Sequence, residues 1–83
     1  MPTVLIVEDN SFSRRLFRVL FEGKGHLVHE AGSFAQASAK LELHDFALVV
    51  TDFQLGEDRT GLCLLKHLQS MPSPPVAIMV SGT

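Results

Sequence analysis

Three unbroken apolar runs constrain the fold of this chain more strongly than any other feature of its sequence. They are residues 4–7 (VLIV), 47–50 (ALVV) and 76–80 (VAIMV), and all contain β-branched side chains. Runs this short do not make buried helices, and continuous apolarity is typical of strands covered on both faces. Strands of that kind belong to parallel sheets with helices packed on either side. A more mixed segment, residues 27–31 (LVHEA), suits a strand at the edge of the same sheet.

Helical patterns fill the intervals between these runs. Residues 11–22 carry apolar side chains at helical spacing, with charged side chains on the opposite side. The apolar side chains expected to form the packing face are Phe12, Leu16, Val19 and Leu20. Ser33 is placed to cap a second helix, and a third is expected over about residues 60–70, before the proline-rich segment 72–75. The order β-α-β-α-β-α-β predicts an α/β fold, a doubly wound parallel sheet with right-handed crossovers.

The composition supports one globular domain over residues 1–83 and weighs against several functional classes. Hydrophobic residues make up 46% of the chain and charged residues 19%, which is far from the disordered class. A formal net charge of −2 gives no basic field for nucleic acid. The apolar runs are far shorter than a membrane span, and the N-terminus does not have the pattern of a signal peptide. Because Cys63 is the only cysteine, no disulfide framework is expected, and the simplest location is the reducing cytoplasm.

Acidic and hydroxyl side chains follow the predicted strands where those strands end. Glu8 and Asp9 come directly after the first run, and Asp52 comes shortly after the run at 47–50. Ser81 follows the last run. Because doubly wound sheets place their sites at the C-terminal strand ends, we expect three carboxylates and a hydroxyl to meet at one edge. Carboxylates that lie close together repel unless a cation neutralises them, and Mg²⁺ suits such oxygen ligands, so one carboxylate could then attack a phosphoryl group.

These motifs resemble those of response-regulator receiver domains, the phosphoacceptor modules of two-component signalling. Residues 4–10 (VLIVEDN) are similar to the opening strand and acidic pair of receivers. Residues 47–52 (ALVVTD) are similar to their phosphorylation strand, and residues 80–82 (VSG) to the end of their fourth strand. The resemblance covers the whole chain in order and spacing, and it implies a flavodoxin-like fold.

The resemblance also implies roles for the residues at the strand ends. Asp52 would be the phosphoacceptor for a sensor histidine kinase or a phosphotransfer protein. Asp9 and Asp52 would bind Mg²⁺ directly, Glu8 would act through a water molecule, and the backbone carbonyl of Gln54 would complete the protein ligands. Ser81 would contact the phosphoryl group and act as a switch. Such a module is a signalling phosphoacceptor and not an enzyme, although it would assist its own phosphorylation and dephosphorylation.

The chain departs from the family pattern after its fourth predicted strand. It stops at Thr83, whereas receivers continue with a helix, a strand that carries a lysine, and a last helix. The resemblance therefore predicts a C-terminally incomplete receiver, in which Lys24, Lys40 and Lys66 lie in the wrong elements to replace that lysine. The absent lysine leaves an alternative function open: a receiver-like protein-interaction module that does not carry phosphate.

The first predicted helix is apolar over a wider arc than one packed face requires. Phe17 and Phe21 occupy the flank on which the last helix of the family would lie. We expect both rings to be exposed, together with the unpaired edge of the fourth strand. Self-association through these surfaces is the expected consequence.

Several of these residues also have ordinary structural interpretations. Acids such as Glu8 and Asp9 favour helix N-termini, and a lone Asp or Ser after a strand is commonly a turn residue. A phosphohydrolase with a strand-end Asp nucleophile would need a second Asp where this chain has Gln54.

The histidines lack the spacing of a metal site and are expected to be solvated. The arginines of the first helix are also expected to be solvated, although that helix is a candidate surface for kinase docking. These residues are His26, His29, His44 and His67, with Arg14, Arg15 and Arg18.

Overall fold

The computed structural model describes residues 3–52 and 61–80 of the chain. These residues form four strands and three helices, which are β1 (Thr3–Val7), α1 (Ser11–Gly23), β2 (Leu27–Ala31), α2 (Phe34–Leu43), β3 (Leu48–Asp52), α3 (Gly61–Gln69) and β4 (Val76–Val80). The alternation of strands and helices confirms the order that the sequence predicts. Two predicted site residues, Gln54 and Ser81, lie outside the described residues.

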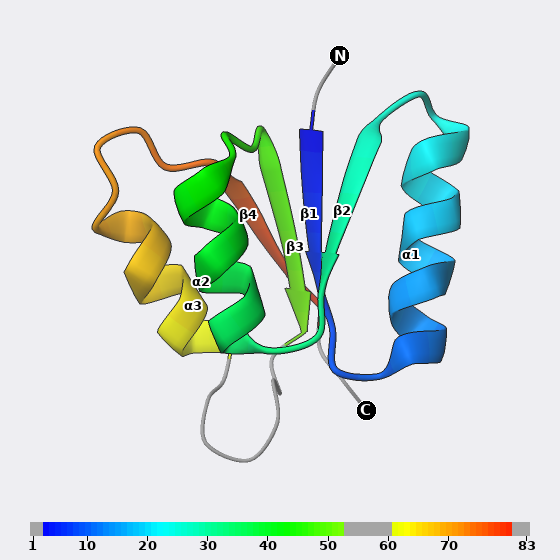
Figure 1. The fold of residues 1–83 in the computed structure, drawn as a ribbon, viewed down its shortest axis with the longest axis horizontal. Helices are drawn as coiled ribbons and strands as arrows, with labels where there is room; N and C mark the ends of the chain where they lie inside the picture. The colour runs from blue at the N-terminus through cyan, green and yellow to red at the C-terminus, as the bar shows by residue number, and fades with distance from the viewer. Residues whose placement is uncertain (1–2, 53–60, 81–83) are drawn as a thin grey trace.

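The four strands form one parallel sheet in the order β2-β1-β3-β4. At their C-terminal ends, Val7 of β1 is paired with Ala31 of β2 and with Thr51 of β3. Asp52 at the end of β3 is paired with Val80 of β4. All four strands therefore end at the same edge of the sheet, which lies at the bottom of Figure 1. The doubly wound, flavodoxin-like arrangement is confirmed.

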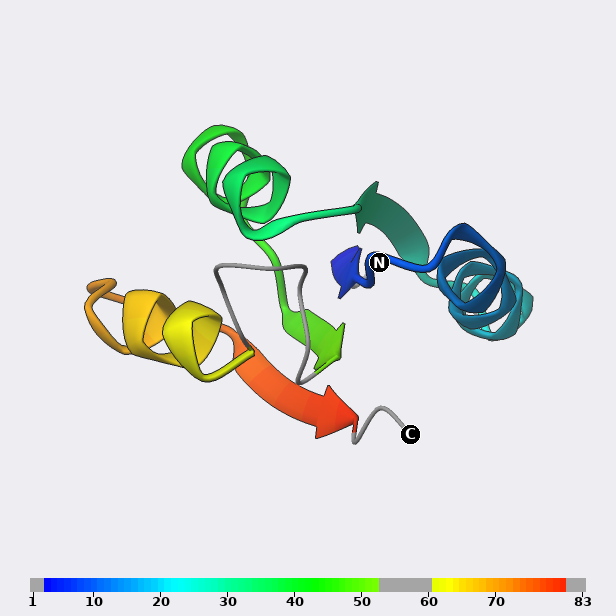
Figure 2. The ribbon, with the colours of Figure 1, turned by 90° about the horizontal axis from the view of Figure 1, so that it is seen from below.

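Helices cover the sheet on both faces, which explains why the central strands are continuously apolar. Leu5 of β1 points into a cluster with residues of α2 and α3, whereas Val4 and Ile6 point to the opposite face, toward α1. Figure 2 shows α2 and α3 on one side of the sheet and α1 on the other. Leu64 of α3 is fully buried against the first face, and burying a leucine of this kind contributes about 2 kcal/mol. None of the helices in the described part of the chain has the length and apolarity needed to cross a bilayer.

Helix α1 packs through a different stripe from the one that the sequence predicts. Phe17 and Phe21, which were expected to be exposed, are half-buried against the cluster that contains Val4, Ile6 and Val50. The predicted apolar stripe faces solvent instead, and its exposed members are Phe12, Leu16, Val19 and Leu20.

The arginines of α1 help to explain which face of this helix packs on the sheet. Arg14 and Arg18 lie within one turn of the two phenylalanines, and both pair with Glu30 of β2. These ion pairs hold the arginine side of the helix close to β2, and the burial of the neighbouring rings Phe17 and Phe21 against the sheet favours the same orientation. The prediction that these arginines are solvated is therefore wrong for Arg14, which is half-buried, and holds for Arg18, which pairs with Glu30 but stays exposed.

Strand β4 leaves apolar side chains exposed on the face of the sheet that α1 partly covers. Ile78 is paired with Val50, so the two side chains lie on the same face. Val50 is buried, whereas Val76 is 67% exposed and Ile78 is 47% exposed. The predicted unpaired edge of the fourth strand is also present, because β4 is the last strand of the sheet that the described residues form.

Candidate functional site

The C-terminal ends of β1 and β3 bring three carboxylates together. Glu8 and Asp9 follow β1 directly, and Asp52 is the last residue of β3. Because β1 and β3 are neighbours with Val7 paired to Thr51, Glu8 and Asp52 leave the sheet side by side. The side-chain oxygens of the three residues all lie within 4.8 Å of one another. The predicted meeting of these carboxylates is confirmed, whereas the places of Ser81 and Gln54 fall outside the described residues.

Burial and like charge act together on this cluster. Glu8 is 8% exposed and Asp52 is 9% exposed, whereas Asp9 faces solvent. Burial acts most strongly, and together with the neighbouring Asp9 and Asp52 it raises the pKa of Glu8 from 4.5 to about 7, against the lowering effect of the hydrogen bond from the Asn10 N–H. The raised pKa therefore reports mainly the burial of the Glu8 carboxyl, with a smaller contribution from the neighbouring carboxylates.

The donor atoms of the cluster fit a hard divalent cation. All three groups offer oxygen, and they come from two adjacent strand ends that the sheet holds at a fixed separation. Mg²⁺ is commonly bound through one or two carboxylates with waters and phosphate oxygens. A cation among Glu8, Asp9 and Asp52 would also relieve the repulsion that adds to the effect of burial on the pKa of Glu8.

Asn10 connects the acidic cluster to the start of α1. Its backbone N–H donates to Oε1 of Glu8 at 3.0 Å, and its own Oδ1 accepts from the Ser13 N–H at 3.0 Å. Asn10 is therefore the N-cap of α1 and a partner of the Glu8 carboxyl. The sequence contained a signal for this role, because asparagine directly before a helical pattern is a favoured cap.

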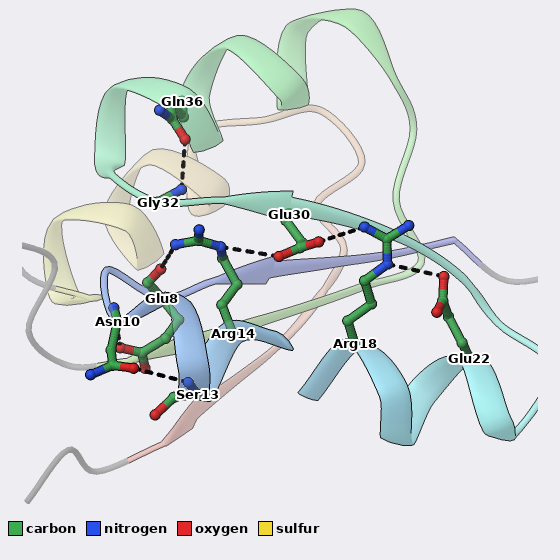
Figure 3. Close-up of polar contacts among 9 residues, drawn as sticks. All are labelled: Glu8, Asn10, Ser13, Arg14, Arg18, Glu22, Glu30, Gly32 and Gln36. Carbon is green, nitrogen blue, oxygen red and sulfur yellow. Dashed lines mark hydrogen bonds and ion pairs between the residues drawn. The ribbon is translucent and has the colours of Figure 1, made fainter. Parts of the chain in front are cut away.

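Arg14 is a second contact of the cluster that the sequence analysis missed. Its Nη1 donates to the backbone carbonyl of Glu8 at 2.8 Å, and its Nε donates to Oε1 of Glu30 at 3.1 Å (Figure 3). Its side chain is 22% exposed. The pattern of residues 11–22 places Arg14 on the polar side of a helix, but nothing in it identifies a partner sixteen residues away on β2.

The lysines and His29 lie away from the acidic edge. Lys24 is the C-cap of α1 and Lys66 is in the last turn of α3, while Lys40 Nζ lies 3.5 Å from Nδ1 of His29. The His29 ring packs against His44 and Phe46, with centroids 4.7 and 5.3 Å away. Burial lowers the pKa of His29, and Lys40 and His44 add to this effect. The prediction that His29 is solvated is wrong, because the side chain is half-buried.

Comparison with known proteins agrees with this geometry. Residues 4–83 match the family model described as the response regulator receiver domain. The alginate biosynthesis transcriptional regulatory protein AlgB of Pseudomonas putida is 39% identical over 66 residues, which cover 80% of this chain. The matched region is only 14% of that protein, so the chain spans a small part of this relative.

Solved structures reproduce the same fold. The response regulator receiver domain (CheY-like) from Methylobacillus flagellatus superposes with a TM-score of 0.91 and 28% identity, covering 100% of this chain and 71% of that one. The response regulator protein TrrA from Thermotoga maritima, solved in complex with Mg(2+)-BeF, also gives a TM-score of 0.91. It is 19% identical, with coverage of 100% of this chain and 71% of its own, and its likeness shows the fold.

Proposed function

Since this chain belongs to the response regulator receiver domain family, we propose that it is a phosphoacceptor module of a two-component phosphorelay, phosphorylated on Asp52 by a partner histidine kinase. Members of this family are signalling modules and not classical enzymes. The observation that carries the proposal is the convergence of Glu8, Asp9 and Asp52 at the C-terminal edge of the sheet. We assign residues 1–83 to a single receiver domain, of which they cover 71% in a solved relative, and place the domain in the cytoplasm, in line with the lone cysteine.

The proposed chemistry begins at the carboxylate of Asp52. One of its oxygens attacks the phosphorus of the donor while the bond from phosphorus to the leaving group breaks, so Asp52 becomes an acyl phosphate. The leaving group is the imidazole of a histidine kinase or of a phosphotransfer protein. Ser81 would hydrogen-bond a phosphoryl oxygen and report its presence to the rest of the domain.

Asp9, Asp52 and the backbone carbonyl of Gln54 would hold Mg²⁺, with Glu8 acting through a water molecule. When bound, Mg²⁺ would offset charge on the phosphoryl oxygens. The oxygen-only cluster supports this assignment, as does a family member that was solved with Mg(2+)-BeF. This chain's own contribution is to place the acceptor residue Asp52, which is 9% exposed, at the end of a central strand.

The test of the proposal is phosphorylation by a small donor. Incubation with acetyl phosphate and Mg²⁺ is expected to add one phosphoryl group to the chain, with acetate released, and EDTA is expected to prevent it. Intact-mass spectrometry reads the adduct directly. A folded protein that takes up no phosphoryl group would favour the second candidate function.

That second candidate is a receiver-like interaction module that does not carry phosphate. The positions of Lys24, Lys40 and Lys66 favour it, because all three lie on helices or helix ends away from the acidic edge. The exposed apolar stripe of α1 would suit either function as a docking surface for a partner.

We expect the protein to self-associate through the exposed stripe of α1. Leu16 is 51% exposed and Leu20 is 61% exposed, and together with Phe12 they form a row at steps of four on one side of the helix. At high concentration, light scattering should give an average mass above the 9.1 kDa of one chain, and the double substitution Leu16→Ser and Leu20→Ser should return it to one chain.

The control is Leu43→Ser, because Leu43 is 75% exposed on α2 and lies outside this stripe. It should leave the average mass of the wild type unchanged. A folded wild-type protein that scatters as a single chain at every concentration would contradict the expectation.

A further inference from the structure

Two hydrogen bonds hold the backbone of Glu8, and Arg14 donates one of them. The Glu8 N–H donates to the Ala31 carbonyl at 3.0 Å, as an extension of the pairing between β1 and β2. The Glu8 carbonyl accepts from Arg14 Nη1 at 2.8 Å. The first contact belongs to the sheet, whereas the second depends on a single side chain.

Arg14 is itself anchored, so its contact with Glu8 is not a loose surface interaction. Its Nε donates to Glu30 Oε1 at 3.1 Å, and the other oxygen of Glu30 accepts from Arg18 (Figure 3). The hydrogen bond from Arg18 lowers the pKa of Glu30 most, with Arg14 adding to the effect, so the carboxylate stays charged. Arg18 also pairs with Glu22 on the same helix. A chain of charged contacts thus runs from the outer surface of α1 to the Glu8 carbonyl.

We propose that Arg14 is a positioning residue for the acidic cluster: by fixing the Glu8 carbonyl against Glu30, it sets the orientation of the Glu8–Asp9 peptide and thereby the affinity of the cluster for a divalent cation. The inference rests on the proposed function, because it deepens the role of the same site. Arg14 itself makes no contact with the cation and acts only through the Glu8 carbonyl.

The mechanism follows from the geometry of a peptide bond. The carbonyl of Glu8 and the N–H of Asp9 belong to one rigid plane, so a fixed carbonyl direction also fixes where the Asp9 backbone begins. Asp9 faces solvent, so its position depends strongly on the backbone that carries it. Without the Arg14 contact, this peptide could rotate in the cation-free protein. Cation binding would then have to fix its orientation, and the conformational entropy lost in doing so would weaken the affinity.

Gly32 gives a way to move the guanidinium without removing any charge. A Cβ at this position would lie 3.1 Å from Arg14 Nη1 and 3.4 Å from Gln36 Oε1. The guanidinium would have to shift by a few tenths of an ångström to make room, which would disturb its hydrogen bond to the Glu8 carbonyl. Gly23 is the matched control, because a Cβ there meets nothing within 4 Å.

The test is Mg²⁺ titration of the folded protein, followed by the amide shifts of Asp9 and Asn10 in nitrogen-edited NMR spectra. Arg14→Met is expected to raise the dissociation constant about tenfold, in the range seen for residues that orient metal ligands. Gly32→Ala is expected to raise it in the same direction, while Gly23→Ala leaves it unchanged. Arg15→Met, on an exposed neighbour of the same helix, controls for the loss of one positive charge.

The outcomes separate this inference from the function on which it rests. Wild-type protein that binds no Mg²⁺ would contradict the cation site itself. Wild-type binding with equal dissociation constants in Arg14→Met and Arg15→Met would overturn the role of Arg14 alone. A purely structural role would lower the melting temperature and leave the dissociation constant of the folded protein unaltered. If Arg14→Met does not fold, Gly32→Ala against Gly23→Ala decides the matter.

Discussion

Replacing Asp9 with asparagine is expected to weaken Mg²⁺ binding by about 100-fold, because the substitution removes a charged ligand and keeps its shape. Asp9 is the solvent-facing member of a cluster whose oxygens lie within 4.8 Å of one another. Its side chain is therefore available to a hydrated cation without rearrangement of the core. Titration of the amide shifts with Mg²⁺ measures the dissociation constant directly.

Asp45→Asn is the matched control for this loss. Asp45 is exposed and precedes β3, at the opposite end of that strand from Asp52. The control removes the same charge from the chain and should leave the dissociation constant unchanged. Equal affinity in Asp9→Asn and the wild type would show that the cation binds without Asp9 and would remove it from the ligand set.

Replacing Glu8 with glutamine is expected to stabilise the metal-free protein by about 1–2 kcal/mol at about pH 8. The unfolded chain releases the Glu8 proton near 4.5, whereas burial and the neighbouring carboxylates raise the pKa in the folded protein to about 7. The contribution of Glu8 to stability is therefore greatest below pH 4.5 and is lost as the pH rises through about 7. A glutamine cannot ionise, and its Oε1 can still accept from the Asn10 N–H.

Urea unfolding in EDTA at about pH 5 and about pH 8 measures the difference between the wild type and Glu8→Gln. The comparison must be made at each pH, because His29 acts in the opposite direction: its lowered pKa reduces stability as the pH falls. Glu42→Gln, on an exposed residue of α2, should not differ from the wild type at either pH. A Glu8→Gln advantage that is equal at both pH values would contradict the pKa assignment.

The fold was predictable because its strongest constraint is local. The uninterrupted apolar runs of β1 and β3 require cover on both faces, and the chain alternates strand and helix, so few topologies remain. The meeting of Glu8, Asp9 and Asp52 was predictable for the same reason. Parallel strands end at one edge, whatever the details of packing.

The packing face of α1 was not predictable, because the helix is apolar over too wide an arc for its sequence to identify one face. The choice between the stripe of Leu16 and Leu20 and the pair Phe17 and Phe21 depends on the partners of the helix in space. One such partner is Glu30, which lies on another element and pairs with Arg14 and Arg18. The same long-range contact concealed the role of Arg14 beside the acidic cluster.

The central claim is that Asp52 is the phosphoacceptor, and intact-mass spectrometry after incubation with acetyl phosphate and Mg²⁺ tests it most directly. Three proteins are compared: the wild type, Asp52→Asn, and Asp45→Asn as a matched loss of charge. We expect a Mg²⁺-dependent phosphoryl adduct on the wild type and on Asp45→Asn, and none on Asp52→Asn. An adduct that persists in folded Asp52→Asn, or a folded wild type that acquires none, would contradict the claim.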